Sequence, residues 1–306
     1  MSKTEISQSE KRFQESLGAL FNEDKESELS CLFLKSSTDH GVIRNGGRNG
    51  ARYAPKSLLS TLKKFSQTPN LKQYSFSEKE VSSSENEIQD FHGAQLKEAS
   101  LISDFLRKYS HSFICHIGGG HDHIFPLLKA LGENYSEIVV INVDAHADTR
   151  TDQNFHSGTP FRQFANSYMG TFHLFQVGLH PFANTESTLS PLEKGSETIL
   201  WSSELTIENV NAYFKKIEKV ISPNTAVIFS LDCDALPASS VPGVSAVNPA
   251  GVSLEILHKI WSNYRALSFS HRPILGIYEL NPIYDTLASL SMRTIGSFVF
   301  SCLNDR

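Results

Sequence analysis

The chain has 306 residues, of which 40% are hydrophobic and 20% are charged, and its formal net charge is −5. Its Lys and Arg residues are scattered, which argues against nucleic acid or an acidic membrane surface as a partner. These values are typical of a globular protein, and we expect a single domain over residues 1–306 with residues 1–30 as a peripheral segment.

The spacing of the cysteines and the length of the apolar runs indicate the cellular compartment of the protein. The four cysteines lie far apart, mostly in apolar runs, which favours buried, reduced thiols over disulfides. They are Cys31, Cys115, Cys233 and Cys302. The first residues lack the apolar stretch of a secretory signal, and the apolar runs are shorter than the roughly 20 residues that a membrane helix needs. We therefore expect a cytoplasmic protein without a membrane segment.

Short apolar runs alternate with helical patterns along the chain. In chain order they predict strand 31–35, helix 96–108, strand 112–117, helix 123–132, strands 137–144 and 172–179, helix 205–221, strand 225–232, helix 253–268 and strand 273–280. The strands are nearly continuous in apolar residues, as expected when helices cover both faces of a parallel sheet. The pattern predicts the α/β class, as a three-layer α/β/α domain around a mostly parallel sheet. The polar, Ser-rich segment 81–93 is interpreted as a surface excursion.

Polar motifs follow four of the predicted strands at the point where each strand ends. They are GGGH (118–121), DAHAD (144–148), DCD (232–234) and ELNP (279–282). In open α/β sheets, ligands bind outside the carboxyl ends of the strands. We therefore expect these motifs to meet in one site.

The stretch 144–148 places Asp144, His146 and Asp148 at alternating positions. Alternate residues of an extended chain share a face, and carboxylates so close repel one another unless a cation lies between them. The clusters together offer two imidazoles and four carboxylates, which suits Mn²⁺ or a similar divalent ion, and four carboxylates balance two such ions. The candidate ligands are His121, Asp144, His146, Asp148, Asp232 and Asp234.

Each motif taken singly also has a simpler interpretation. A lone Asp-x-Asp is more often a turn or a helix cap, and Cys233 is expected to point into the core. His123 is interpreted as an exposed residue at a helix start. The joint occurrence of the clusters at strand ends favours metal binding.

The motifs GGGH, DAHAD, SLDCD (230–234) and YELNP (278–282), in this order, resemble the ureohydrolase family. This family includes arginases, agmatinases, guanidino-acid hydrolases and formimidoylglutamases, and the resemblance runs from about Gly41 to the last strands. It implies an arginase-like fold, a homo-oligomer and two Mn²⁺ per chain. One ion would be held by His121, Asp144, Asp148 and Asp232, and the other by Asp144, His146, Asp232 and Asp234.

Within the family, four segments are most similar to formimidoylglutamases. These segments are 44–55, 156–163, 178–185 and 234–246. Arginases and agmatinases have a histidine before the glycine of the HSGTP region, where this chain has Ser157. His156 stands one place earlier, as a catalytic candidate whose role stays open.

The resemblance also implies roles for side chains around the metals. Two bridging ions would lower the pKa of a shared water toward neutrality. Asp148 would carry a proton to the leaving amine, and Glu279 would hold the cationic nitrogens of the substrate. Because N-formimidoyl-L-glutamate carries two carboxylates, its site needs cations, preferably arginines. The substrate-binding candidates are Arg48 first, then Arg162, Asn184 and Ser157.

The sequence therefore predicts a hydrolase that cleaves a small amidine, with formimidoylglutamate as the expected substrate. A hydrolase of arginine, agmatine or a guanidino acid is the alternative within the family. Two further alternatives are proteins without amidine hydrolase activity. One is a non-catalytic relative that binds metal, and the other is a deacetylase with a single zinc ion, which would not require the second pair of aspartates.

Overall fold

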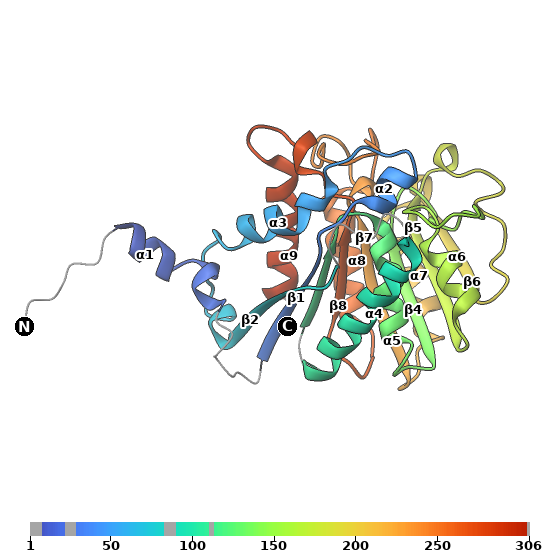
Figure 1. The fold of residues 1–306 in the computed structure, drawn as a ribbon, viewed down its shortest axis with the longest axis horizontal. Helices are drawn as coiled ribbons and strands as arrows, with labels where there is room; N and C mark the ends of the chain where they lie inside the picture. Colours follow the sequence, from blue (N-terminus) through green and yellow to red (C-terminus); the bar gives the residue numbers. More distant parts are fainter. Residues whose placement is uncertain (1–7, 22–28, 83–89, 110–112, 305–306) are drawn as a thin grey trace, which may run out of the picture.

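The protein is represented by a computed structural model that describes residues 8–21, 29–82, 90–109 and 113–304. Within these ranges, eight strands form one sheet in the order β2-β1-β3-β8-β7-β4-β5-β6, and all neighbouring strands are parallel (Figure 1). The strands are β1 (Leu29–Ser36), β2 (Tyr74–Glu80), β3 (Phe113–Gly118), β4 (Glu137–Val143), β5 (Thr171–Leu179), β6 (Ser196–Trp201), β7 (Thr225–Asp232) and β8 (Ile274–Tyr278).

Helices cover both faces of this sheet and divide its core in two. The core on one face contains side chains of α3 (Ala54–Leu62), α7 (Ile207–Glu218), α8 (Leu254–Ala266) and α9 (Leu290–Asn304). The core on the other face contains side chains of α4 (Phe91–Lys108), α5 (Ile124–Leu131) and α6 (Pro160–Ser167). Two short helices, α1 (Gln8–Gln14) and α2 (His40–Arg44), lie outside these layers. The predicted three-layer α/β/α class is confirmed.

Strand β4 shows why the central strands are apolar throughout. Its Val139 and Ile141 pack in one half of the core, whereas Ile138 and Val140 pack in the other. Alternate side chains of a strand point to opposite faces, so a strand covered on both sides has no polar face. The continuous apolar runs in the sequence arise from this arrangement.

The two edge strands, β2 and β6, are not among the elements predicted from the sequence. Each is partly exposed along most of its length, so neither shows a continuous apolar run. Helices α1, α2, α3, α6 and α9 are not among the predicted elements either. Ser112 of the predicted strand 112–117 and residues 83–89 of the predicted excursion lie outside the described residues. Helix α4 begins at Phe91, earlier than the predicted start at 96.

Part of the N-terminal segment that was expected to be peripheral packs against the sheet. Leu17 is fully buried, and the ring of Phe21 stacks on Phe33 and Phe76 at centroid distances of 5.6 and 5.4 Å. Helix α1 projects away from the rest of the molecule (Figure 1). None of the helices in the described ranges has both the length and the apolar character that a membrane span requires.

The sheet order brings the four polar motifs together. The strands that precede them, β3, β8, β7 and β4, are consecutive neighbours in the sheet. Because all are parallel, their carboxyl ends lie along one stretch of the same edge. This stretch of the sheet edge carries the candidate site.

Candidate metal centre and substrate cavity

The loop after β3 presents His121 through a turn that needs glycine. A Cβ atom on Gly119 would lie 1.9 Å from the carbonyl oxygen of Thr38, so no side chain fits at this position. The turn leads into a short 3₁₀ helix, His121–His123. The sequence GGGH therefore allows the backbone of this loop to lie directly against the end of β1.

The Nδ1 atom of His121 faces three carboxylates. It lies 2.8 Å from Asp148 Oδ2, 3.1 Å from Asp144 Oδ2 and 3.2 Å from Asp232 Oδ2. None of these contacts has hydrogen-bond geometry, so Nδ1 has no hydrogen-bond partner although it is buried. The other ring nitrogen, Nε2, lies 2.9 Å from the hydroxyl of Ser230. This bond leaves Nδ1 directed toward the three carboxylates.

A second group lies beside the first and shares Asp144 with it. It consists of Asp144, His146 and Asp234, and His146 Nδ1 lies 3.2 Å from Asp234 Oδ2. The Oδ1 atom of Asp234 is buried without a hydrogen-bond partner. Asp232, which was expected to serve both ions, lies with the first group. Its Oδ2 faces His121, whereas its Oδ1 accepts the backbone N–H of Asp234.

Burial and the crowding of acids raise pKa values at this centre. Burial, followed by the charge of Asp148, raises the pKa of Asp144 to about 6. Burial and the charge of Asp234 also raise the pKa of Asp232, and the charge of Asp234 raises the pKa of His146 to about 11. Buried carboxylates this close cannot all ionise without a cation.

The side chains fit a pair of divalent cations. They combine carboxylate oxygens with two imidazoles, they form two groups joined by one aspartate, and they include buried ligand atoms that lack a protein partner. Oxygen-rich sites with a minority of imidazoles suit divalent ions of the Mn²⁺ type rather than a thiolate zinc site. The structure thus brings all six predicted ligands together, in an arrangement that suits a binuclear metal site.

Two residues of the site adopt a backbone conformation that is unusual without glycine. Asp148 has φ of 52° and Glu279 has φ of 63°. Such conformations persist where the surrounding structure fixes them, and they cluster at functional sites. Glu279 is buried, its Oε1 accepts the backbone N–H of His121 at 3.0 Å, and burial raises its pKa to about 8. Its carboxylate thereby stays beside the metal ligands.

A cavity of about 730 Å³ opens above the metal ligands. The predicted site residues that line it include His146, Asp148, Asp232, Asp234 and Glu279. Of the predicted substrate-binding residues, Arg48, Ser157 and Asn184 also line it. The cavity therefore unites the metal centre with side chains from distant parts of the chain.

Arg48 and Asn184 are also bonded to the protein itself. The Arg48 guanidinium donates to the carbonyl oxygens of Val244 and Ser245 and lies 4.0 Å from the ring centroid of Tyr284. The amide of Asn184 accepts the N–H of Ala147 and donates to two backbone carbonyls. In this structure the Asn184 amide supports the DAHAD loop.

Two of the predicted catalytic and substrate-binding residues, Arg162 and His156, do not line the cavity. Arg162 donates to the carbonyl oxygens of Thr149, Ser190 and Pro191, so its buried guanidinium ties two loops together. His156 accepts the N–H of Gly158 at Nδ1 and lies 2.8 Å from Asp152 through Nε2. Both of its ring nitrogens are therefore used within its own loop. In this structure the side chains of Arg162 and His156 therefore bind neighbouring loops and not the cavity.

A second arginine of the cavity is not among the residues predicted from the sequence. Arg150 follows the DAHAD motif by two residues, lines the cavity and is exposed. Its guanidinium lies 3.0 Å from Asp152 and donates to Asn45 at 2.7 Å. The only signal in the sequence was its proximity to Asp148. His123, expected to be exposed, is buried instead.

The metal-free protein is expected to lose stability as the pH rises. Asp144 and Glu279 have raised pKa values, about 6 and about 8, so the folded state retains protons that the unfolded chain has already released. A raised folded pKa contributes stability below the unfolded pKa, and this contribution is lost as the pH rises through the folded pKa. From about pH 5 to about pH 8, the melting temperature of chelated protein should therefore fall. Stabilisation by added Mn²⁺ should increase over the same pH range, because metal ligands bind in their deprotonated form.

Thermal unfolding with a chelator and with Mn²⁺, across this pH range, measures both trends. A melting temperature of the chelated protein that rises over the range would contradict the expected protonation of the site. Proton release on Mn²⁺ binding, measured by calorimetry in buffers of different ionisation enthalpy, provides an independent check.

Comparisons with known proteins agree with this geometry. Residues 38–303 match the sequence model of the arginase family. A formimidoylglutamase of Rhodococcus opacus is 28% identical over 286 residues, which cover 90% of this chain and 86% of that protein. The formimidoylglutamase structure from Bacillus subtilis has a TM-score of 0.79 at 20% identity, covering 94% of this chain and 91% of that chain. A Trypanosoma cruzi formiminoglutamase structure with Mn²⁺ has a TM-score of 0.74 at 23% identity, covering 94% of this chain and 97% of that chain.

Proposed function

Because this chain belongs to the arginase family, we propose that it is a hydrolase of linear amidines that converts N-formimidoyl-L-glutamate and water to L-glutamate and formamide. The main support is one observation, the pair of His/Asp groups that share Asp144 at a cavity with arginines in its wall. The similarity to formimidoylglutamases supports the choice of substrate. We further propose a cytoplasmic homo-oligomer that uses two Mn²⁺ per chain.

The proposed ligands divide between the two ions according to the two groups. His121, Asp148 and Asp232 belong to one ion, His146 and Asp234 belong to the other, and Asp144 belongs to both. When bound, the ions supply Lewis-acid chemistry that activates a water for attack at neutral pH.

Glu279 and Asp148 act on the substrate in this proposal. Hydrolysis joins a water oxygen to the formimidoyl carbon and breaks the bond from this carbon to the glutamate nitrogen, which takes up a proton as it leaves. Asp148 faces the cavity and carries this proton. The buried carboxylate of Glu279 accepts a hydrogen bond from the cationic amidine nitrogens, and this contact favours its ionised form.

The arginines of the cavity match the charge of the substrate. Formimidoylglutamate carries two carboxylates, whereas agmatine carries none. Arg48 and Arg150 line the cavity from two separate loops, and guanidinium groups bind carboxylates through paired hydrogen bonds. A wall with two arginines therefore favours a dicarboxylate over an amine-tailed guanidine.

Formimidoylglutamate should be hydrolysed faster than any guanidino compound. The experiment uses protein loaded with Mn²⁺ and offers it formimidoylglutamate, arginine, agmatine and guanidino acids in parallel, with kcat/KM as the readout. Faster turnover of arginine or agmatine would overturn the proposed substrate. Bound metal without hydrolysis of any of these compounds would indicate a non-catalytic relative.

Replacement of Arg48 by alanine should raise KM for formimidoylglutamate by about ten- to a hundredfold, because a hydrogen bond to a charged group contributes about 1.5–3 kcal/mol. The metal content should stay the same, since Arg48 contacts none of the ligands in the structure. The matched control is Arg44→Ala. Arg44 lies in the same segment, donates to the carbonyl of Phe155 and does not line the cavity. An unchanged KM in Arg48→Ala would remove this residue from substrate binding.

A further inference from the structure

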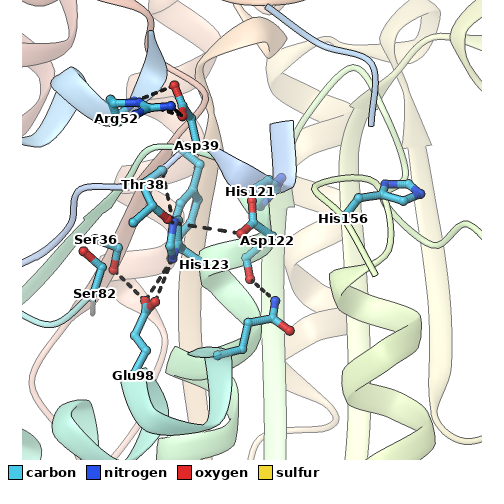
Figure 2. A network of polar contacts seen from close by, with 12 residues as sticks. Ser36, Thr38, Asp39, Arg52, Ser82, Glu98, His121, Asp122, His123 and His156 are labelled. Carbon is cyan, nitrogen blue, oxygen red and sulfur yellow. Dashed lines mark hydrogen bonds and ion pairs between the residues drawn. The ribbon is translucent and has the colours of Figure 1, made fainter. Parts of the chain in front are cut away.

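A second cluster of buried titratable groups lies behind the glycine turn and takes no part in the proposed chemistry. It joins Glu98 on α4, His116 on β3 and His123 after the turn to the end of β1. Figure 2 shows Glu98 and His123 beside Ser36 and Thr38. Glu98, His116 and His123 are all buried. A buried ion pair is in general a weak source of net stability, so the presence of this one calls for a more specific explanation.

Both ring nitrogens of His123 are bound to the protein. Nδ1 lies 3.0 and 2.9 Å from the two carboxylate oxygens of Glu98. Nε2 lies 3.2 Å from the carbonyl oxygen and 3.0 Å from the hydroxyl of Thr38. The imidazole thus connects helix α4 to the end of β1, as Figure 2 shows.

Glu98 has a second contact with the end of β1. The hydroxyl of Ser36 donates to its Oε1 at 2.6 Å and lies 2.7 Å from Nε2 of His116. The Nδ1 atom of His116 lies 3.0 Å from the hydroxyl of Tyr278, whose ring stacks on His121 at 4.9 Å. A continuous set of contacts therefore runs from Glu98 to the ring of a proposed metal ligand.

The end of β1 in turn lies directly against the turn that carries this ligand. The backbone N–H of Gly119 donates to the carbonyl of Ser36 at 3.0 Å, and the Thr38 carbonyl occupies the place of a Cβ on Gly119. On its other side, the carbonyl of Gly119 accepts the N–H of Glu279 at 3.0 Å. The turn is thus held between the Glu98–His123 pair and Glu279.

We propose that the buried Glu98–His123 pair is a positioning element that fixes the glycine turn, and through it the orientation of His121 and Glu279. Neither Glu98 nor His123 contacts the substrate cavity. The pair acts only on the metal group that contains His121, because this residue follows the glycine turn. In the second metal group, His146 and Asp234 lie on other loops. The inference rests on the proposed metal centre, whereas its metal-binding test does not depend on the identity of the substrate.

The test is a Mn²⁺ titration of the metal-free protein, full length, by calorimetry. In Glu98→Gln, the affinity for the ion assigned to His121 should fall by about ten- to a hundredfold. This is the usual loss when a residue that orients a metal ligand is replaced. The affinity for the second ion should stay at the wild-type value. With formimidoylglutamate, KM should rise in addition, because Glu279 is held by the same turn.

The matched control is Ser103→Ala. Ser103 is buried on the same helix and donates its hydroxyl to Glu133, away from the turn. It should change neither affinity, even if it lowers the melting temperature as much as Glu98→Gln does. A milder variant, Thr38→Val, removes one partner of His123 and should weaken the same ion in the same direction. It keeps the test decisive if Glu98→Gln does not fold.

Equal weakening of both ions, or no change in a folded Glu98→Gln, would overturn the proposal. If Glu98→Gln does not fold, unchanged affinities in Thr38→Val would overturn it as well. A wrong choice of substrate would give a different result. In that case the wild-type protein binds two ions and hydrolyses no formimidoylglutamate, and the selective loss of one ion in Glu98→Gln still supports the positioning role.

Discussion

Exchange of Asp144 for asparagine is expected to lower kcat by about a thousandfold or more, because the two cations contribute several kcal/mol and each 1.36 kcal/mol is tenfold in rate. Asp144 is the residue that both ligand groups share. Its Oδ2 faces His121, and its Oδ1 accepts the backbone N–H of His146 at 2.8 Å. Asparagine keeps the shape but removes the charge and one oxygen, so both ions lose part of their binding.

The measurement combines kcat with the metal content of dialysed protein by elemental analysis. Asp144→Asn should retain fewer than two ions per chain, whereas the control Asp104→Asn should retain both. Asp104 is an exposed aspartate on α4 that pairs with Arg107. Two tightly bound ions and wild-type turnover in Asp144→Asn would refute the shared ligand and with it the assignment of the centre.

The central part of the fold could be predicted from the sequence, whereas its edges could not. Strands β4 and β7 are buried on both faces, which makes them continuous apolar runs. The edge strands β2 and β6 have partly exposed faces and resemble loops in composition. The sequence also contains no direct signal for the insertion of β8 between β3 and β7, because strand order depends on long-range packing.

The grouping of the candidate metal ligands could be predicted because each lies at or just after the end of a central strand, and parallel strands bring their ends to one edge. The roles of the arginines could not. Arg162 and Arg150 look alike in the sequence, yet Arg162 is buried among backbone carbonyls and Arg150 lines the cavity. His123 presented the same difficulty, since its partner Glu98 lies 25 residues away on a different helix. Such contacts are determined by tertiary packing, which local patterns do not contain.

The place of Glu279 suggests a test that separates substrate binding from metal binding. Glu279→Gln should lower kcat/KM by about thirtyfold or more, because the loss of one partner of a buried charge pair costs about 2–5 kcal/mol and each 1.36 kcal/mol is tenfold. The glutamine can still accept the N–H of His121, as the carboxylate does at 3.0 Å. The turn should therefore keep its place, and the metal content should stay at the wild-type value.

The loss in Glu279→Gln should be specific for cationic amidines, since its physical cause is the missing negative charge beside the amidine nitrogens. Glu255→Gln is the matched control, because Glu255 is an exposed residue of the first turn of α8. Its kinetics should equal those of the wild type. Parallel kinetics and elemental analysis of both variants decide the role. Unchanged kcat/KM in Glu279→Gln would exclude this carboxylate from substrate binding, and a loss of metal would make it part of the metal centre instead.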